Sequence, residues 1–181
     1  TRYGTVTGVQ TCALPISALK TFATLSPIPG FRRYLDTVLE TRPDEVLTTT
    51  ERNALKTFFA ADSRQGDMRE LLSTPNWFRD QGLVAALKQP LMRVCANYLA
   101  KEKRNRRALD RVAHFHLSNG ARVERINWLA DISPKGLRHS AGLMVNYRYR
   151  LRDIEANHEA YTGASEVAVS GAVRKLLKPQ D

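Results

Sequence analysis

The sequence has little cysteine and no long apolar run. Its 181 residues include two cysteines, Cys12 and Cys95, too few for a disulfide framework and without the spacing of a zinc site. No stretch of about eighteen apolar residues occurs, so no membrane-spanning helix is expected. The chain starts without a secretory signal and does not end in the peroxisomal tripeptide Ser-Lys-Leu. These absences predict a cytoplasmic protein outside the membrane.

Phosphate-binding and hydrolase motifs are absent as well. The sequence contains neither GxGxxG nor GxxxxGK[ST], and it has no Gly-x-Ser-x-Gly elbow, so a P-loop enzyme and an α/β-hydrolase triad are both unsupported. Positive charge, by contrast, is plentiful, because 28 Lys and Arg against 18 Asp and Glu give a formal net charge of +10. Such a charge favours a polyanionic partner: nucleic acid, an acidic membrane surface or a phosphorylated cofactor.

The first seventeen residues differ from the rest. Residues 1–17 have no helical or strand periodicity, and Val6 to Ile16 (VTGVQTCALPI) matches the translation of a common short-read sequencing adapter codon for codon. We therefore predict that residues 1–17 are an artefact and that residues 18–181 are native, and we exclude the former from fold reasoning. Cys12 then carries no meaning. The alternative is a genuine strand over TVTGVQT.

The native part opens with a strand and several helices. Residues 20–25 are apolar and β-branched, which predicts a buried strand that the segment Ser26 to Gly30 (SPIPG) ends as a rigid loop. Apolar residues at helical spacing then predict helices over 31–39, from residue 50, over 67–72 and over 77–99, the last one kinked or divided at Pro90. Everything from 31 to 104 is therefore expected to be helical.

The pattern changes near residue 112. Residues 112–117 (VAHFHL), the pair Asn119-Gly120 and residues 121–128 favour a β-hairpin. A loop over 131–140, a third strand over 142–150 and a final helix over 162–177 are expected to follow. The order of these elements predicts a mixed α/β chain whose sheet lacks its opening strands.

A few side chains could carry chemistry. Ser26 lies between a strand and two prolines, which favours a fixed hydroxyl at a sheet edge, although a loop-capping serine is the simpler interpretation. On a strand, His114 and His116 would project from one face. They could bind a metal, but no further ligand cluster completes a site, so none is predicted. Either could donate a proton near neutral pH or have a purely structural role.

Other features have simpler explanations. Tyr147 and Tyr149 share one face of the expected third strand and would pack there. The run Lys101 to Arg107 (KEKRNRR) is the densest positive segment, and it is expected to be a solvated loop because interleaved aromatic residues for base stacking are missing. An isolated buried thiol is expected at Cys95.

Three blocks of sequence together are more specific than any single residue. In chain order they are Leu25 to Phe31 (LSPIPGF), Val112 to Asp131 with VAHFHL, NGA and RINW, and Gly142 to Tyr149 with GLM and NYRY. These blocks resemble the signatures of the malonyl-CoA decarboxylases, and the resemblance covers essentially all of residues 18–181. It identifies the chain as a C-terminal portion of that family's catalytic domain.

The resemblance implies a fold and a site. The family's catalytic domain is similar to the acyl-CoA-binding fold of the GNAT acetyltransferases, so the expected fold is an incomplete GNAT-like mixed α/β sheet with helices. The family pairs a serine with a histidine of the Phe-His-Leu element, which points to Ser26 and His116 as catalytic and substrate-binding residues. The second tyrosine of Asn-Tyr-Arg-Tyr lies near this pair, which points to Tyr149.

The implied activity is decarboxylation of malonyl-CoA to acetyl-CoA and carbon dioxide. Such a reaction would pass through a thioester enolate that His116 protonates, and it would need neither a metal nor an organic cofactor because coenzyme A is part of the substrate. The full-length enzyme is expected to be a homo-oligomer that binds no nucleic acid. Two alternatives remain open: an N-acyltransferase that uses acyl-CoA, and a basic nucleic-acid-binding module built on residues 101–107.

The family's pyrophosphate-binding turn and an acidic residue near the site lie before the serine loop. The resemblance therefore implies that both are missing from the chain in the form given. We expect it to expose one sheet edge and to bind coenzyme A poorly.

Overall fold

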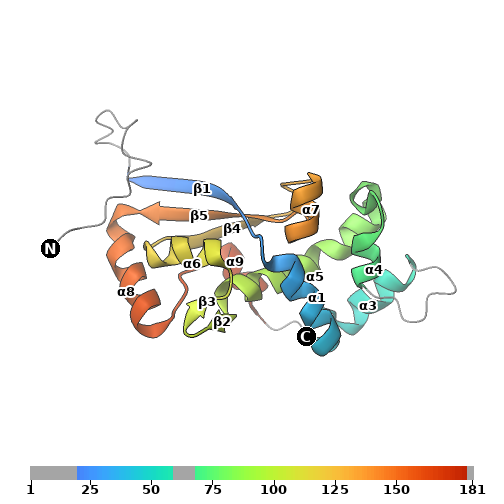
Figure 1. The fold of residues 1–181 in the computed structure, drawn as a ribbon, viewed down its shortest axis with the longest axis horizontal. Coiled ribbons are helices and arrows are strands. Elements are labelled where there is room, and N and C mark those ends of the chain that lie inside the picture. The colour runs from blue at the N-terminus through green and yellow to red at the C-terminus, as the bar shows by residue number, and fades with distance from the viewer. Residues whose placement is uncertain (1–19, 59–67, 179–181) are drawn as a thin grey trace.

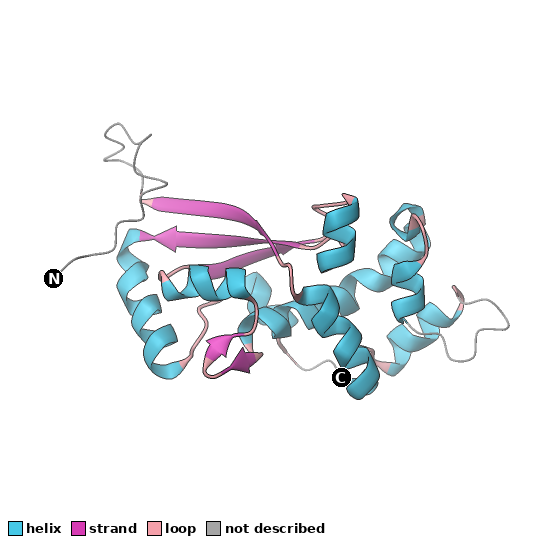
Figure 2. Cartoon of the chain, in the orientation of Figure 1, coloured by secondary structure: helices cyan, strands magenta, loops and turns pink. Residues whose placement is uncertain are grey.

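The structure is a computed structural model that describes residues 20–58 and 68–178. The predicted artefact at residues 1–17 lies outside the described residues, so that prediction stays untested. Figures 1 and 2 show an elongated molecule with the main sheet at one end and helices α3 and α4 at the other. The described strands are β1 (Thr21–Pro27), β2 (Lys103–Arg104), β3 (Arg107–Ala108), β4 (Arg122–Asn127) and β5 (Met144–Arg150).

Helices make up most of the remainder. Among the described residues the α-helices are α1 (Phe31–Thr41), α2 (Pro43–Val46), α3 (Thr49–Lys56), α4 (Met68–Ser73), α5 (Gln81–Ala100), α6 (Arg111–Ser118), α7 (Pro134–Ser140), α8 (Ile154–Ala164) and α9 (Gly171–Leu176). Single 3₁₀ turns lie at Trp77–Arg79 and Leu151–Asp153. The predicted strand at 20–25 and the predicted helices at 31–39 and 67–72 are confirmed, each shifted by a residue or two at its ends.

The main sheet has the strand order β1-β5-β4, and both pairings are antiparallel. Ser26 lies opposite Val145, and the register shifts in β4 between Val123 and Arg125. A single parallel bridge joins Val123 to Val169 at the far side of β4. The strand β1 therefore lies at one edge of the sheet as the described residues form it, and Phe22 and Leu25 on it are 46% and 56% exposed. Among the described residues, no strand pairs with the other side of β1.

One continuous core joins the sheet to the helices. Phe31, Leu35 and Val38 form the buried face of α1 at helical spacing. The helix α5 carries many of the other buried apolar side chains and contacts both α1 and β4. It runs without a break through Pro90, which is buried, so of the two predicted effects of this proline, a kink or a division, the division is wrong.

The predicted hairpin over 112–128 is wrong in its first half. Residues 111–118 form α6, whose N-terminus is capped by the Asp110 carboxylate, and only residues 122–127 form a strand. The alternating apolar pattern suggested a strand, but the buried residues Ala113, His116 and Leu117 follow helical spacing. Phe115 is 56% exposed. An Asp cap three residues before Ala113 was the local signal for a helix.

Two further expectations need correction. The final helix predicted over 162–177 is two shorter helices, α8 and α9, because Ser165 adopts a left-handed conformation that ends α8. The loop expected over 131–140 contains α7, which Ser133 caps by accepting from the Gly136 N–H group. The expected loop at 101–107 instead contains the short hairpin of β2 and β3, with Asn105 and Arg106 at positive φ.

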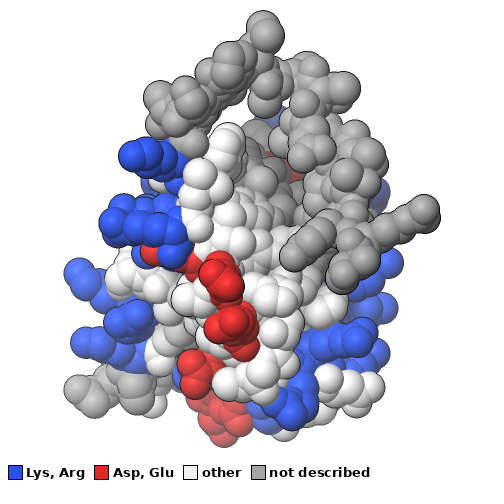
Figure 3. Space-filling view, turned by 90° about the vertical axis from the view of Figure 1, so that its left-hand side faces the viewer, with Lys and Arg blue, Asp and Glu red and all other residues white. Residues whose placement is uncertain are grey.

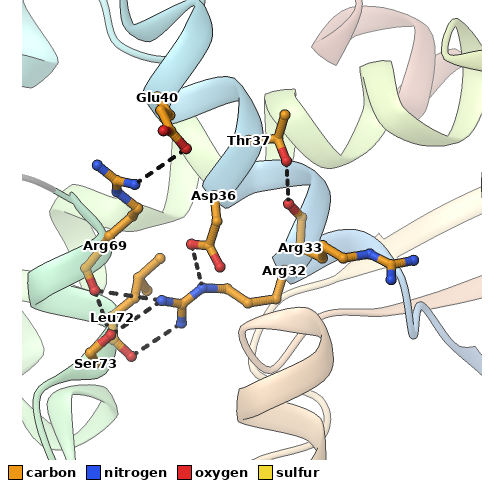
Figure 4. Close-up of polar contacts among 8 residues, drawn as sticks. All are labelled: Arg32, Arg33, Asp36, Thr37, Glu40, Arg69, Leu72 and Ser73. Atoms are coloured by element: carbon orange, nitrogen blue, oxygen red, sulfur yellow. Dashed lines mark hydrogen bonds and ion pairs between the residues drawn. The ribbon is translucent and has the colours of Figure 1, made fainter.

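Polar contacts of Arg32 connect α1 to α4 (Figure 4). Its guanidinium donates to Asp36 at 3.0 Å, to the Leu72 carbonyl at 3.3 Å, to the Arg69 carbonyl at 3.5 Å and to the Ser73 hydroxyl at 3.3 Å. The Leu72 carbonyl belongs to the last turn of α4, where helical partners are missing. Arg32 thus caps α4 from a neighbouring helix.

Replacing Arg32 should therefore weaken the fold. We expect Arg32→Ala to lower the free energy of unfolding by about 1–2 kcal/mol, since one partly buried cation serves several acceptors. Arg33→Ala is the matched control, because the Arg33 side chain is exposed and points away from this network in Figure 4. Urea denaturation of the chain compares the two variants. Equal losses would contradict the capping role.

Candidate functional site

Ser26, the serine to which the sequence analysis pointed, is the second-last residue of β1. Ser26 is 6% exposed, and the strand continues through Pro27, two residues past its predicted end. Thr24 lies two residues earlier and so shares its face of the strand. The two hydroxyl oxygens are 3.0 Å apart. The Ser26 hydroxyl is therefore fixed by a neighbour and by β-sheet pairing.

The histidine comes from α6. His116 lies on the last turn of that helix and is 8% exposed. Its Nε2 atom is 3.1 Å from Ser26 Oγ, although ninety residues separate the two in the chain. Its Nδ1 atom is 2.7 Å from the Tyr149 hydroxyl, which β5 supplies. The structure thus brings together all three residues that the resemblance pointed to.

Aromatic residues surround the imidazole. Tyr147 stacks on His116 with ring centroids 4.3 Å apart and an interplanar angle of 20°. Tyr147 and Tyr149 lie two residues apart on β5, so the prediction that they share one face is confirmed. Burial raises the pKa of the Tyr149 phenol, which therefore stays protonated near neutral pH. It can donate a hydrogen bond to His116.

Burial also determines the charge of the imidazole. Desolvation lowers the pKa of His116 below its ordinary value of 6.5. The pKa of His114 is lowered by desolvation and by the nearby Arg107 cation. Both rings are thus neutral near pH 7, and each offers one donor nitrogen and one acceptor nitrogen.

This charge state predicts a pH dependence of stability. Because the folded pKa lies below the unfolded one, the unfolded chain takes up protons first as the pH falls. We expect the free energy of unfolding to decrease as the pH drops below about 6.5 and to level off below the folded pKa. A histidine-labelled chain, titrated by NMR when folded and in urea, should show His116 titrating at lower pH when folded. Equal pKa values in the two states would contradict the desolvation.

His114 and His116 do not share a face, contrary to the strand prediction. Residues two apart on a helix point about 200° apart. His114 faces α8, where its Nδ1 atom lies 2.8 Å from the Tyr161 hydroxyl. The same hydroxyl accepts from the Ala108 N–H group at 2.8 Å. The structure therefore gives His114 a packing role and separates it from Ser26.

Sequence reasoning missed three contributors to this site. Thr24 could have been found from its position two residues before Ser26, on the same strand face. The stacking of Tyr147 on His116 and the buried carboxylate of Asp110 had no clear signal in the sequence once α6 was taken for a strand. The described residues contain no group of three or more His, Cys, Asp or Glu side chains that could hold a metal ion. Cys95 is buried and unpaired, as predicted.

The chain belongs to a family of mixed α/β domains. The sequence model described as "Malonyl-CoA decarboxylase C-terminal domain" matches residues 7–181, and this chain is a member of that family. The mitochondrial malonyl-CoA decarboxylase of Anser anser anser is 42% identical to it over 164 residues, which are 88% of this chain and 32% of the goose protein. The chain thus spans about a third of the length of this curated relative.

Solved structures agree with this assignment. Malonyl-CoA decarboxylase from Rhodopseudomonas palustris aligns with a TM-score of 0.73 and 45% identity, over 87% of this chain and 33% of the other. The enzyme from Agrobacterium vitis aligns with a TM-score of 0.74 and 40% identity, over 90% and 37%. The fold class predicted from the sequence, a partial GNAT-like α/β sheet with helices, is confirmed.

Proposed function

We propose that this chain carries the serine–histidine half of a malonyl-CoA decarboxylase active site. The observation that carries the proposal is the contact of 3.1 Å between Ser26 Oγ and His116 Nε2, with Tyr149 on the opposite ring nitrogen. The family membership and the relatives at about 40% identity support malonyl-CoA as the substrate of the whole protein.

The first step breaks the bond between the carboxylate carbon and the α-carbon of the malonyl group. Carbon dioxide leaves, and the electron pair forms a thioester enolate whose oxygen carries the developing charge. We propose that the Ser26 hydroxyl donates a hydrogen bond to the malonyl carboxylate or to the thioester oxygen. Because the thioester accepts the electron pair, we propose that neither a metal nor an organic cofactor takes part.

The second step adds a proton to the α-carbon. If Tyr149 donates to Nδ1, the neutral His116 ring carries its proton on Nε2, which faces Ser26. An enolate carbon is a strong enough base to take a proton from a neutral imidazole, either directly or through the Ser26 hydroxyl. Water then returns the proton to His116. The net reaction consumes one proton and yields acetyl-CoA and carbon dioxide.

A basic cavity beside the site supports an anionic ligand. It has a volume of about 770 Å³ and is lined by Pro29, Gly30, Arg33, Tyr34, Thr37, Tyr98, Arg104, Leu109, Asp110 and Arg111. It begins three residues beyond Ser26 and includes three arginines and one carboxylate. The positive charge suits the phosphates of coenzyme A, and we propose that the nucleotide end of the substrate passes close to it.

The test restores the upstream coding sequence and measures carbon dioxide release from malonyl-CoA. We expect decarboxylation by the longer protein, equal amounts of acetyl-CoA and carbon dioxide, and activity without added metal in the presence of a chelator. An N-acyltransferase would instead release free coenzyme A from acetyl-CoA only when an amine is added. That outcome, without decarboxylation, would replace our proposal with the first alternative.

A nucleic-acid-binding module is less well supported. The end of the molecule seen in Figure 3 has basic side chains on both flanks and acidic side chains between them, so its positive charge is not one continuous surface. The run at 101–107 ends α5 and forms the hairpin of β2 and β3, and none of its members is aromatic. We propose that the protein binds no nucleic acid; binding that falls steeply with rising salt would contradict this.

Location and assembly remain proposals. Among the described residues, no helix combines the length and apolar character needed to cross a bilayer. We keep the cytoplasm as the proposed location, while the goose relative carries "mitochondrial" in its name. We also propose that the longer protein forms a homo-oligomer. Fractionation of cells that express a tagged longer protein tests the first proposal, and light scattering of that protein tests the second.

A further inference from the structure

One buried carboxylate connects the two elements that carry the serine and the histidine. Asp110 is 2% exposed and lies directly before α6. Its Oδ1 atom accepts from the N–H groups of Val112 and Ala113, both at 2.9 Å. Its Oδ2 atom accepts from the Gly30 N–H group at 3.4 Å and from the Tyr98 hydroxyl at 3.3 Å. The two oxygens thus serve two different parts of the fold.

Two rigid segments connect Asp110 and its partner Gly30 to the site: the segment from Gly30 back to Ser26, and the helix α6 from Asp110 to His116. From Gly30 the chain runs back to Ser26 through two prolines, whose rings fix φ, and through Ile28, which is fully buried. From Asp110 the helix α6 rises about 9 Å to His116. An added Cβ atom at Gly30 would collide with the Tyr98 hydroxyl, so the close approach requires glycine there. The carboxylate fixes the separation of the two segments at their far ends.

We propose that Asp110 is a positioning residue that sets the distance between Ser26 and His116 by joining the N-terminus of α6 to the segment that follows β1. The proposal rests on the decarboxylase function proposed above. Asp110 lines the cavity proposed for the nucleotide end of the substrate, and we assign it no contact with the reacting malonyl group. One oxygen keeps α6 capped, while the other holds the segment after Ser26 against that helix.

Because Oδ1 caps α6 and Oδ2 accepts from Gly30 and Tyr98, a substitution that changes only Oδ2 can test the positioning role. Asparagine is as good a helix cap as aspartate, so Asp110→Asn can keep its remaining oxygen on Val112 and Ala113. Its amide group replaces Oδ2 and cannot accept a hydrogen bond from Gly30. The variant therefore removes the connection and retains the cap. The matched control is Asp80→Asn. Asp80 caps α5 by accepting from the Leu83 N–H group at 3.0 Å, and its side chain makes no other hydrogen bond to a described residue.

In the longer protein, we expect Asp110→Asn to lower kcat about 100-fold while KM changes less than about threefold, since a displacement near 1 Å can cost that factor. Asp80→Asn should leave kcat unchanged, whatever its effect on melting temperature. An unchanged kcat in Asp110→Asn would overturn the proposal. The proposal would also be overturned if kcat fell in both variants in proportion to their loss of stability. If Asp110→Asn does not fold, Asp110→Ser, which keeps only a cap acceptor, takes its place under the same criteria.

A second readout needs no substrate. In the chain labelled at histidine, Asp110→Asn should shift the ring ¹⁵N resonances of His116 and raise its pKa toward 6.5, because a loosened site admits water. The Asp80→Asn control should change neither. Unchanged His116 resonances in Asp110→Asn would overturn the positioning role. If instead the resonances shift but the parent protein does not decarboxylate malonyl-CoA, the proposed function fails and the positioning role stands.

Discussion

Substituting His116 by alanine should lower kcat for malonyl-CoA decarboxylation by about 10³-fold in the longer protein, because a general acid contributes about 10²–10⁴. The Ser26→Ala substitution should lower it by about 10²-fold, since it removes one hydrogen-bond donor to the developing charge. The double variant should be little worse than His116→Ala alone, because the two side chains act as one unit through their contact of 3.1 Å. Carbon dioxide release measured at saturating substrate checks all three values.

The control is His114→Asn, on the same helix but facing α8. It should leave kcat within about threefold of the parent, because its ring contacts Tyr161 and does not reach Ser26. If Ser26→Ala and His116→Ala both keep full turnover, the site assignment is wrong, whatever the whole protein catalyses. A loss in His114→Asn as large as that in His116→Ala would show that these substitutions act through the stability of α6 instead.

The second large effect concerns the turn between α6 and β4. Gly120 has a φ of +78°, and a Cβ atom there would meet the carbonyl oxygen of Ile154 and, at 2.8 Å, its Cγ2 atom. We expect Gly120→Val to lower the free energy of unfolding by about 3–5 kcal/mol, because a β-branched residue is strained at this φ and backbone cannot easily move away. Chemical denaturation of the chain measures the loss.

Gly163→Ala provides the opposite control. Gly163 lies within α8, and nothing is within 4 Å of the position its Cβ would occupy. Alanine there should raise stability by up to about 1 kcal/mol, because it restricts the unfolded chain and favours helix. If the two substitutions have similar small effects, the close approach of Gly120 to Ile154 is not a constraint on the fold.

The positive φ of Gly120 also explains why the segment before it was wrongly predicted to be the first strand of a hairpin. The Asn119-Gly120 pair was interpreted as the two-residue turn of a hairpin, and the positive φ that this requires is present at Gly120. The segment before it, however, is a helix, so the same glycine ends α6. Local turn chemistry reveals that the chain reverses, but it does not reveal whether a strand or a helix comes before the turn.

The sequence by itself determined the motifs, the family and the strands β1 and β5, because long ordered blocks and period-two patterns are properties of neighbouring residues. It also determined that Tyr147 and Tyr149 share a face, since alternation along a strand is local. The resemblance pointed to His116, but the local pattern could not distinguish it from His114. The contact of His116 with Ser26 depends on the rotation of α6 against the sheet, which the tertiary structure decided. Likewise, Asp110 gains its partners at Gly30 and Tyr98 through packing across eighty and twelve residues, which no local pattern encodes.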